Sequence, residues 1–261
     1  MDRSEIKHLA GTHTDLLLDI GSTLLASGAT SERINRNVQR IGNQLGYDVD
    51  IFFDYTGLII TIQLKSDPTI YATRHKKLNR HHANFNILKD ISLLSWKVKE
   101  DEMDVPEIEE ALEEIKTEPT YSRWQILIAV GAACFALCAT AGGNLKSASI
   151  AGVAGFVGMY VRQDLEKRGY LSMIAIMGAS FVSSMIASTD AIFKIGDKPE
   201  ITAATCVLYL IPGVQMINSV IDLIEGYYPM ALARGVFSSY IVLWIAVGIT
   251  LSLMFIGLSN F

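Results

Sequence analysis

The chain has 261 residues, a formal net charge of −5 and a hydrophobic content of 50%, which allows two ordinary domains. The first 123 residues carry 20 acidic and 15 basic side chains, which excludes a nucleic-acid binder with a strongly basic surface. These residues hold 35 of the Asp, Glu, Lys and Arg side chains, and the remaining 138 hold only 14. A polar region is therefore predicted to precede a very apolar one.

The polar region, residues 1–119, is predicted to be a cytoplasmic α+β domain. Its first residues, MDRSEIKHLAGTHTD, contain no apolar stretch of the kind that a signal peptide needs. Amphipathic periodicity predicts helices at Thr14–Ser27 and Ser31–Leu45, each followed by a glycine suited to a helix C-terminus. Further helices are expected at Ala83–Lys97 and Pro106–Ile115.

Strands are expected between these pairs of helices. The apolar and polar residues alternate in VDIFF and again in LIITIQL, and Asp54–Gly57 between them forms a plausible hairpin turn. Thr69–Thr73 is expected to add a third strand. On the second helix, Arg33, Arg36 and Arg40 form a stripe that is interpreted as a surface facing solvent or lipid.

The apolar region, residues 120–261, is predicted to be a bundle of five transmembrane helices. About 20 apolar residues span a bilayer, and five runs approach that length. These runs are Trp124–Ala141, Leu145–Val161, Tyr170–Ser188, Ala203–Ile224 and Gly235–Leu258. The second run is the shortest and the weakest of the five.

Basic residues in the loops set the expected orientation. With the N-terminus inside, inner positions hold more Lys and Arg than outer ones, as the positive-inside rule requires. The inner residues are Arg123, Arg162, Lys167, Arg168 and Arg234, and the outer ones are Lys146, Lys194 and Lys198. The C-terminus is therefore expected outside.

The sequence shows no pattern typical of an enzyme. No nucleophile elbow, phosphate loop or zinc signature is present, and the three cysteines lie inside predicted spans without metal spacing. We therefore expect no catalytic residue, no cofactor and no metal.

The fourth apolar run is predicted to break at Pro212-Gly213. Proline removes a helical hydrogen bond, and a half-helix that starts within a membrane can hold a substrate carboxylate. After the break, polar residues at spacings of three, four and seven share one helical face. The predicted substrate pathway comprises Pro212, Gly213, Gln215, Asn218, Ser219 and Asp222. The alternative is hydrogen bonding between helices, with Asp222 at the inner interface.

A second glycine-rich segment, TAGGNLKS, joins the first two runs. Gly142, Gly143 and Asn144 are expected to form a tight turn on the outer side. The second run then carries faces of small residues that permit close helix packing.

Three segments resemble, in order, the threonine/serine exporter family. They are LLASGATSERINRNVQRIGNQLGYDVDIFF, AGGNLKSASIAGVAGFVG and LIPGVQMINSVIDLIEGYYPMALAR. The most specific marker is Pro212-Gly213 followed by Asn218 and Asp222. A second marker in the cytoplasmic domain comprises Gly28, Ala29 and Arg33, although Ser31-Glu32 departs slightly from the family pattern.

The resemblance implies a multi-pass protein of the bacterial plasma (inner) membrane. Long members of the family carry about ten spans, whereas this chain is similar to the larger subunit of split members, one pair of which is implicated in succinate export. The chain is therefore expected to need a small companion membrane subunit, or otherwise to form a homo-oligomer. Five spans also leave the two termini on opposite sides, as in half of an inverted repeat.

The predicted function is a subunit of a secondary-active exporter that works by alternating access on small carboxylate-bearing metabolites. The side chains favour threonine or serine, whose ammonium would suit Asp222, whereas the split architecture favours succinate. Proton coupling through Asp222 is a hypothesis that rests on its being the best titratable group near the pathway. The alternative function is a membrane-anchored sensor or scaffold whose cytoplasmic domain binds a ligand or protein.

Overall fold

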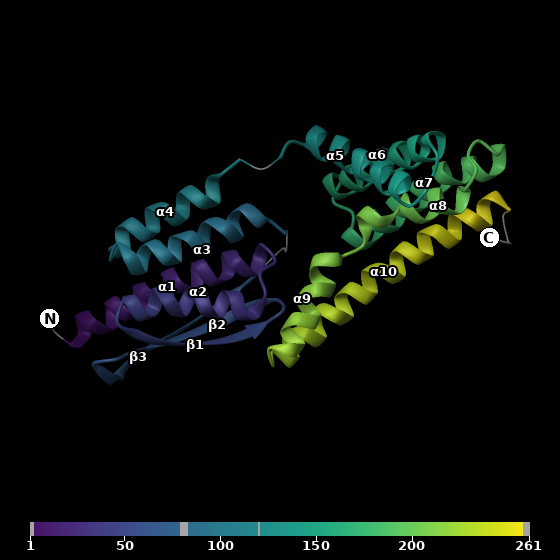
Figure 1. Cartoon of the computed structure of the whole chain (residues 1–261). Helices are drawn as coiled ribbons and strands as arrows, with labels where there is room; N and C mark the ends of the chain where they lie inside the picture. The colour runs from purple at the N-terminus through teal and green to yellow at the C-terminus, as the bar shows by residue number, and fades with distance from the viewer. Residues whose placement is uncertain (1–2, 79–82, 120, 258–261) are drawn as a thin grey trace. The chain divides into compact units, whose positions relative to one another are not determined.

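A computed structural model describes residues 3–78, 83–119 and 121–257 of the chain. It contains two compact units (Figure 1). The first unit comprises the residues up to 119 together with 213–236, and the second comprises 120–212 together with the residues from 237 on. The units therefore do not follow the order of the chain, because a segment from the apolar region packs with the polar one.

The polar part of the first unit is built from four helices and three strands. Helices α1 and α2 come first, then strands β1 to β3, then helices α3 and α4. Their bounds are Arg3–Ala26, Ser31–Gln44, Tyr47–Asp54, Gly57–Leu64, Asp67–Lys77, Phe85–Glu100 and Val105–Thr117. The order matches the sequence prediction, but α1 begins eleven residues earlier than expected, because its first turns are mostly exposed and show little apolar periodicity.

The strands form one antiparallel sheet in the order β1-β2-β3. Asp54 pairs with Gly57, which confirms the predicted hairpin turn. Added at Gly57, a Cβ atom would lie 2.5 Å from the carbonyl oxygen of Lys76 on β3, so the close approach of the strands requires glycine here. The third strand is longer than predicted, because it continues through polar residues that alternate poorly.

The elements of this domain lie in three layers (Figure 1). Helices α1 and α2 cover one face of the sheet, and α3 and α4 cover those helices. The core lies between the layers and includes Leu17, Ile34, Ile60 and Ile91, whose side chains are completely buried. Burial of such side chains contributes roughly 1.5–3 kcal/mol each.

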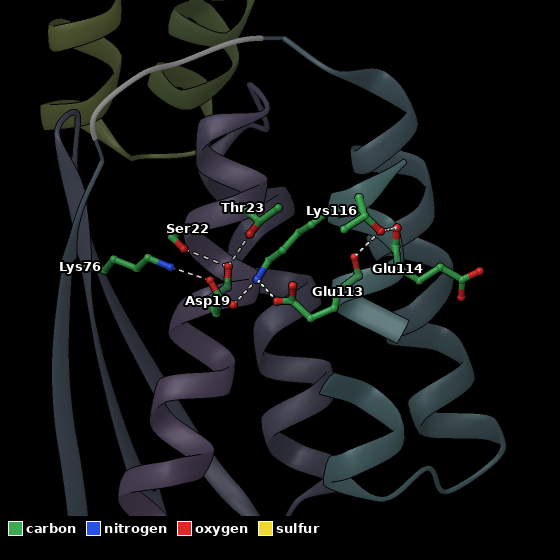
Figure 2. A network of polar contacts seen from close by, with 8 residues as sticks. Asp19, Ser22, Thr23, Lys76, Glu113, Glu114 and Lys116 are labelled. Atoms are coloured by element: carbon green, nitrogen blue, oxygen red, sulfur yellow. Dashed lines mark hydrogen bonds and ion pairs between the residues drawn. The ribbon is translucent and has the colours of Figure 1, made fainter. Parts of the chain in front are cut away.

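A polar network ties α4 to α1 and β3 (Figure 2). The carboxylate of Asp19 on α1 accepts hydrogen bonds from the ammonium groups of Lys76 on β3, at 2.5 Å, and Lys116 on α4. Lys116 also donates to Glu113 at 2.8 Å. Partial burial would raise the pKa of Asp19, but the hydrogen bonds and charges of Lys116 and Lys76 outweigh it and lower the pKa below its usual value.

Because its folded-state pKa is lowered, Asp19 stabilises the domain above its unfolded-state pKa, and this contribution is lost as the pH falls through the folded-state value. We expect Asp19→Asn to lower the free energy of unfolding by about 1 kcal/mol at neutral pH, since the network is partly exposed. The difference from the wild type should shrink progressively as the pH falls from neutral to below the unfolded-state pKa of about 3.9. Urea unfolding at both pH values measures it, and Asp15→Asn, on the exposed side of α1, is the matched control.

The remainder of the first unit is α9, Gly213–Ile224, and the first part of α10, Tyr228–Ile256. Met230 is 2% exposed and belongs to the same hydrophobic core as α1 and α2. Phe53 on β1 and Tyr227 meet edge to face, with ring centroids 5.4 Å apart. The segment 213–236 therefore shares a core with the polar domain.

The second unit contains α5 to α8, a short 3-10 helix η1 and the rest of α10. The new bounds are Arg123–Thr140, Leu145–Lys167, Ser172–Phe193, Pro199–Thr205 and Leu208–Leu210. The break predicted at Pro212-Gly213 is confirmed, because η1 ends at Leu210 and α9 begins at Gly213.

Three helices in the described part of the chain, α5, α7 and α10, are long and apolar enough to span a membrane. The broken pair Pro199–Leu210 and Gly213–Ile224 would be a fourth span if both pieces cross together. Five spans are therefore not confirmed. Helix α6 falls short because its middle is rich in glycine and alanine and its last turns are charged.

Small residues let the helices of the second unit approach closely. A Cβ atom added at Gly155 on α6 would lie 2.5 Å from Sγ of Cys134 on α5. One added at Gly158 would lie 1.9 Å from Oγ of Ser183 on α7 and 3.1 Å from the carbonyl oxygen of Ala179. The predicted small-residue faces of the second run are thus the contact surfaces of α6.

Candidate functional site

Helix α9 is amphipathic, but it buries its polar face and exposes its apolar one, the reverse of a helix in a water-soluble protein. Its two buried residues, Asn218 and Asp222, are polar, whereas large apolar side chains on its other faces are exposed. The exposed ones are Met216, Ile217, Val220, Leu223 and Ile224. A helix in water buries its apolar face, so this arrangement fits a helix whose outer surface meets lipid and whose polar face meets protein.

Asp222 is completely buried and ion-paired. Its Oδ2 lies 3.1 Å from Nη1 of Arg234 on α10, and the two side chains are 0% and 5% exposed. Its Oδ1 accepts a hydrogen bond of 2.9 Å from the backbone N–H of Ser31, in the first turn of α2. The amide groups and dipole at a helix N-terminus favour a negative charge, so the carboxylate has two sources of stabilisation.

The connection between α1 and α2 supplies the other contacts of the site. The amide of Asn218 donates to the carbonyl oxygen of Gly28 at 2.8 Å, and Nη2 of Arg234 donates to that of Ala29 at 2.6 Å. The two markers singled out in the sequence therefore meet: Asn218 binds the carbonyl oxygen of Gly28, and Asp222 binds the N–H of Ser31, two residues after Ala29. Asn218 and Asp222 on α9, Arg234 on α10 and the α1–α2 connection therefore form one site.

A helix C-terminal motif presents these carbonyl groups. Gly28 has φ of +87°, and the N–H groups of Gly28 and Ala29 donate to the carbonyl oxygens of Leu25 and Leu24. This Schellman arrangement ends α1. The carbonyl oxygens of Gly28 and Ala29 are then free of the helix and accept from Asn218 and Arg234. Thr30 then caps α2 by accepting from the N–H of Arg33.

We expect Gly28→Ala to destabilise the protein by about 1 kcal/mol, because alanine disfavours a left-handed backbone. The added Cβ would meet Ala83 at 3.6 Å, an ordinary contact, so the effect should come from the backbone alone. Gly28→Asn should cost less, since asparagine tolerates this conformation. Thermal unfolding measures both, and Gly213→Ala, where an added Cβ has open space, is the matched control.

A small cavity of about 40 Å³ adjoins the ion pair. Its polar lining comes from Tyr55, Gln215, Asn218 and Arg234, and among its described lining residues Arg234 alone is charged. The hydroxyl of Tyr55 donates to Oε1 of Gln215 at 3.4 Å, and burial raises the pKa of Tyr55 to about 12, so it remains a neutral donor at pH 7. The cavity has room for a few water molecules beside a guanidinium group.

Gly213, Ser219 and Asp222 are not among the residues that line this cavity. The hydroxyl of Ser219 donates to the carbonyl oxygen of Ala231 at 2.7 Å and so joins α9 to α10. Pro212 precedes α9 and belongs to the second unit. A role for any of these residues in transport stays a prediction.

Arg33 points away from the site, toward α3. Its guanidinium donates to the carbonyl oxygen of Leu88 at 2.8 Å and to the hydroxyl of Ser92. Arg40 stacks on the ring of Trp96, 3.8 Å from its centroid. The interpretation of the arginine stripe as facing solvent or lipid is therefore wrong for Arg33 and Arg40, which hold α2 against α3.

The turn between α5 and α6 is tight, as predicted. Gly142 has φ of +95°, and the N–H of Gly143 donates to the carbonyl oxygen of Cys138. Asn144 caps α6 by accepting from the N–H of Ser147, and its amide donates to Asp197 at 3.1 Å. These contacts give all three turn residues a structural role, which is to form the turn and to cap α6.

Two buried charged residues were missed as site residues. Arg234 was counted only as a charge that sets orientation, although it lies at the start of an apolar run. Asp190 on α7 is 0% exposed and follows the end of the third predicted run by two residues. An ionisable residue at the edge of an apolar run is the signal that could have found both.

The sequence matches one protein family along most of its length. The family described as "Putative threonine/serine exporter" matches residues 15–256. The chain belongs to this family. No solved structure matches it.

Two relatives match along almost their full length. Proteins of Klebsiella aerogenes and Escherichia coli, each named "Probable succinate transporter subunit YjjP", are 26% and 27% identical over 94% of this chain and 94% and 95% of their own. A "Probable threonine/serine exporter" of Mycobacterium tuberculosis is 26% identical over 94% of this chain but only 46% of its own length. The names of the family and of these relatives indicate a transporter, not an enzyme, so the chain is a membrane transporter protein, as its sequence predicted.

Proposed function

We propose that this chain is a subunit of a secondary-active exporter of small carboxylate-bearing metabolites, and that the Asp222–Arg234 pair is part of its substrate site. The observation that carries the proposal is a buried ion pair between α9 and α10 beside a small cavity, where α9 exposes its apolar face. Ionisable groups in such positions mark substrate or ion pathways in membrane proteins.

Arg234 is the group suited to bind the substrate carboxylate. A guanidinium presents donors in a fork that matches a carboxylate, and in the structure Nη1 faces Asp222 while Nη2 donates to the carbonyl oxygen of Ala29. A substrate carboxylate would compete with Asp222 for Arg234. Binding would then free Asp222 from Arg234 and loosen the hold of α9 on the α1–α2 connection.

The same pair bears on the choice between the two substrate classes. An amino acid could place its carboxylate on Arg234 and its ammonium on Asp222, so that both charges are matched. A dicarboxylate needs a second cation, and the described lining of the cavity offers only Arg234. The side chains thus favour an amino acid, whereas the relatives of equal length are named for succinate.

The proposed architecture has five spans: α5, α7 and α10 each cross the membrane, and α6 and the broken helix are two more spans. The N-terminal domain is proposed to lie in the cytoplasm at the inner membrane. The Mycobacterium tuberculosis relative is matched over less than half of its length, and the relatives of equal length are named subunits. A companion chain would supply the remaining half of the pathway for alternating access.

The test is efflux of labelled succinate and labelled threonine from preloaded cells that express the chain with its companion. We expect efflux of one label, reduced to background by Asp222→Asn and retained by Asp50→Asn, an exposed position on β1. Efflux of neither label, with both chains present in the membrane, would contradict the substrate class. Efflux from liposomes that contain only the monomeric chain would contradict the need for a companion.

A further inference from the structure

One face of the β1–β3 sheet is open in the described part of the chain. Helices α1 and α2 cover the other face (Figure 1), where Lys76 on β3 pairs with Asp19 on α1. Because successive side chains of a strand point to opposite faces, the alternate residues form the open face. These are Asp48, Asp50, Phe52 and Asp54 on β1, Ile59, Thr61 and Gln63 on β2, and Tyr71, Thr73, His75 and Lys77 on β3. All are exposed except Thr61, which is half-buried.

Apolar side chains lie in the middle of the open face. Phe52 and Ile59 are directly opposite each other in the register of β1 and β2, and they are 62% and 36% exposed. Tyr71 on β3 is 66% exposed. Burial of such side chains is favourable, and neighbouring apolar residues left at a surface mark contacts with other proteins. The open face is therefore a candidate docking surface.

The polar side chains give the open face two unlike edges. Strand β1 supplies carboxylates, whereas β3 supplies hydroxyl groups, an imidazole and an ammonium group. Three rows of the sheet therefore run from an acceptor on β1 to a side chain on β3 that can donate. The rows end on Asp48 and Tyr71, on Asp50 and Thr73, and on Asp54 and Lys77. An occupant with the same two edges in reverse order would complement this face.

A second copy of the chain has these edges in reverse order when a twofold axis runs parallel to the strands. Two stacked sheets lie about 10 Å apart with their strands nearly aligned. Half a turn about this axis places β1 of one copy over β3 of the other, and β2 over β2. Asp54 then faces Lys77 of the second copy, twice by symmetry, and Ile59 meets its own counterpart. A twofold axis across the strands would instead place the carboxylates of β1 over one another.

The charges of the open face distinguish a second copy from an anionic membrane surface. The face carries three carboxylates and one lysine, so anionic headgroups would be repelled. A second copy avoids this repulsion, because each acidic edge packs on an edge of donors. Charge complementarity therefore favours the second copy as the occupant.

We propose that the open face of the β1–β3 sheet binds a second copy of this chain, with β1 of each copy packed on β3 of the other. The contact concerns assembly, and export by each copy is not expected to depend on it. Three strands about 4.8 Å apart and seven residues of about 3.4 Å each give a face of roughly 350 Å². A standard stable interface buries about 800 Å² per partner. The association is therefore weak and should benefit from the confinement of both copies to one membrane.

Cysteine cross-linking of the full chain in liposomes, at a low ratio of protein to lipid, tests the contact. Ile59→Cys places a thiol beside the proposed axis, whereas the three native cysteines are buried in the second unit. A short bismaleimide should link Ile59→Cys chains into a covalent dimer. Glu110→Cys, an exposed position on α4, is the matched control and should give only background dimer. Equal yields from the two variants would overturn the proposal.

Reversed charges, introduced into Ile59→Cys, identify the partner as a second copy. Lys77→Asp sets two carboxylates opposite each other and Asp54→Lys two ammonium groups, so each should dimerise about tenfold more weakly than Ile59→Cys alone. A mixture of the two variants restores both opposite pairs and should recover the yield. A mixture that dimerises no better than its components would overturn the proposal, as would linkage in cells to a companion chain in place of a second copy.

The turn residue Asp54 needs its own safeguard, because its carboxylate also accepts from the N–H of Thr56. If Asp54→Lys does not fold, Lys77→Asp alone keeps the test, since salt screens both attraction and repulsion between exposed charges. Raising the salt concentration should then increase the dimer yield of Lys77→Asp and decrease that of Ile59→Cys alone. A change in the same direction for both would overturn the proposed pairing.

Discussion

Replacing Asp222 by leucine should abolish export and lower the free energy of unfolding by about 3–5 kcal/mol. The change leaves the guanidinium of Arg234 buried without its carboxylate, and an uncompensated buried charge is strongly destabilising. It also removes the acceptor for the N–H of Ser31. Efflux measures the first effect, and chemical unfolding in detergent measures the second.

A double variant separates stability from function. Adding Arg234→Met to Asp222→Leu removes both charges, so most of the lost stability should return, because apolar residues of similar volume can replace a buried ion pair. Export should not return, since the group proposed to bind the carboxylate is absent. Asp48→Leu is the control, because it removes the carboxylate of an exposed pair with Lys65 and should cost less than about 1 kcal/mol.

Recovery of export in the double variant would contradict the proposed substrate site and leave the pair as a structural contact. A single variant that is as stable as the wild type would contradict the buried geometry itself. Loss of export together with recovered stability would place the charges in the transport mechanism.

Local patterns in the sequence were sufficient to predict most of the elements. Pro212 breaks a helix for a reason that acts within one turn, and the alternation in β1 and β2 follows directly from the pleat of a strand. The polar spacing of Asn218 and Asp222 likewise depends only on helical geometry. These features required no knowledge of the tertiary fold.

The partners of the polar residues could not be predicted in this way. The N–H of Ser31 and the carboxylate of Asp222 are separated by 191 positions, and no local pattern specifies such a contact. Each of the two markers was found separately, but their meeting depends on α9 packing with the polar domain. The donors to Asp190 were likewise beyond local patterns, because Ser147, Gly196 and Thr202 come from separate segments.

The number of spans was harder to predict than the helices themselves. Helix α6 forms as a long helix because alanine has a high helix propensity, yet its glycines and terminal charges make it weakly apolar. Its small residues serve contact with α5 and α7 rather than contact with lipid. The length of the apolar run therefore predicted a helix here, but its composition could not establish that the helix crosses the membrane.

Helices α7 and α10 approach so closely at Gly248 that a larger side chain there should strongly destabilise the protein. Gly248 on α10 lies so near α7 that an added Cβ atom would be 1.9 Å from Oγ of Ser180 and 2.5 Å from the carbonyl oxygen of Met177. The hydroxyl can rotate away, but the backbone carbonyl cannot move without shifting the helix. We expect Gly248→Val to lower the free energy of unfolding by about 3 kcal/mol or more.

Thermal unfolding in detergent measures this loss, and Ala246→Val, at an exposed position on the same helix, should leave the midpoint nearly unchanged. A further variant identifies the atom responsible. If the clash is with the backbone of α7, adding Ser180→Gly to Gly248→Ala should not restore stability, because the carbonyl of Met177 remains in place. Full recovery would show instead that only the hydroxyl limits the approach of the helices, and that α7 and α10 could accommodate a methyl group between them.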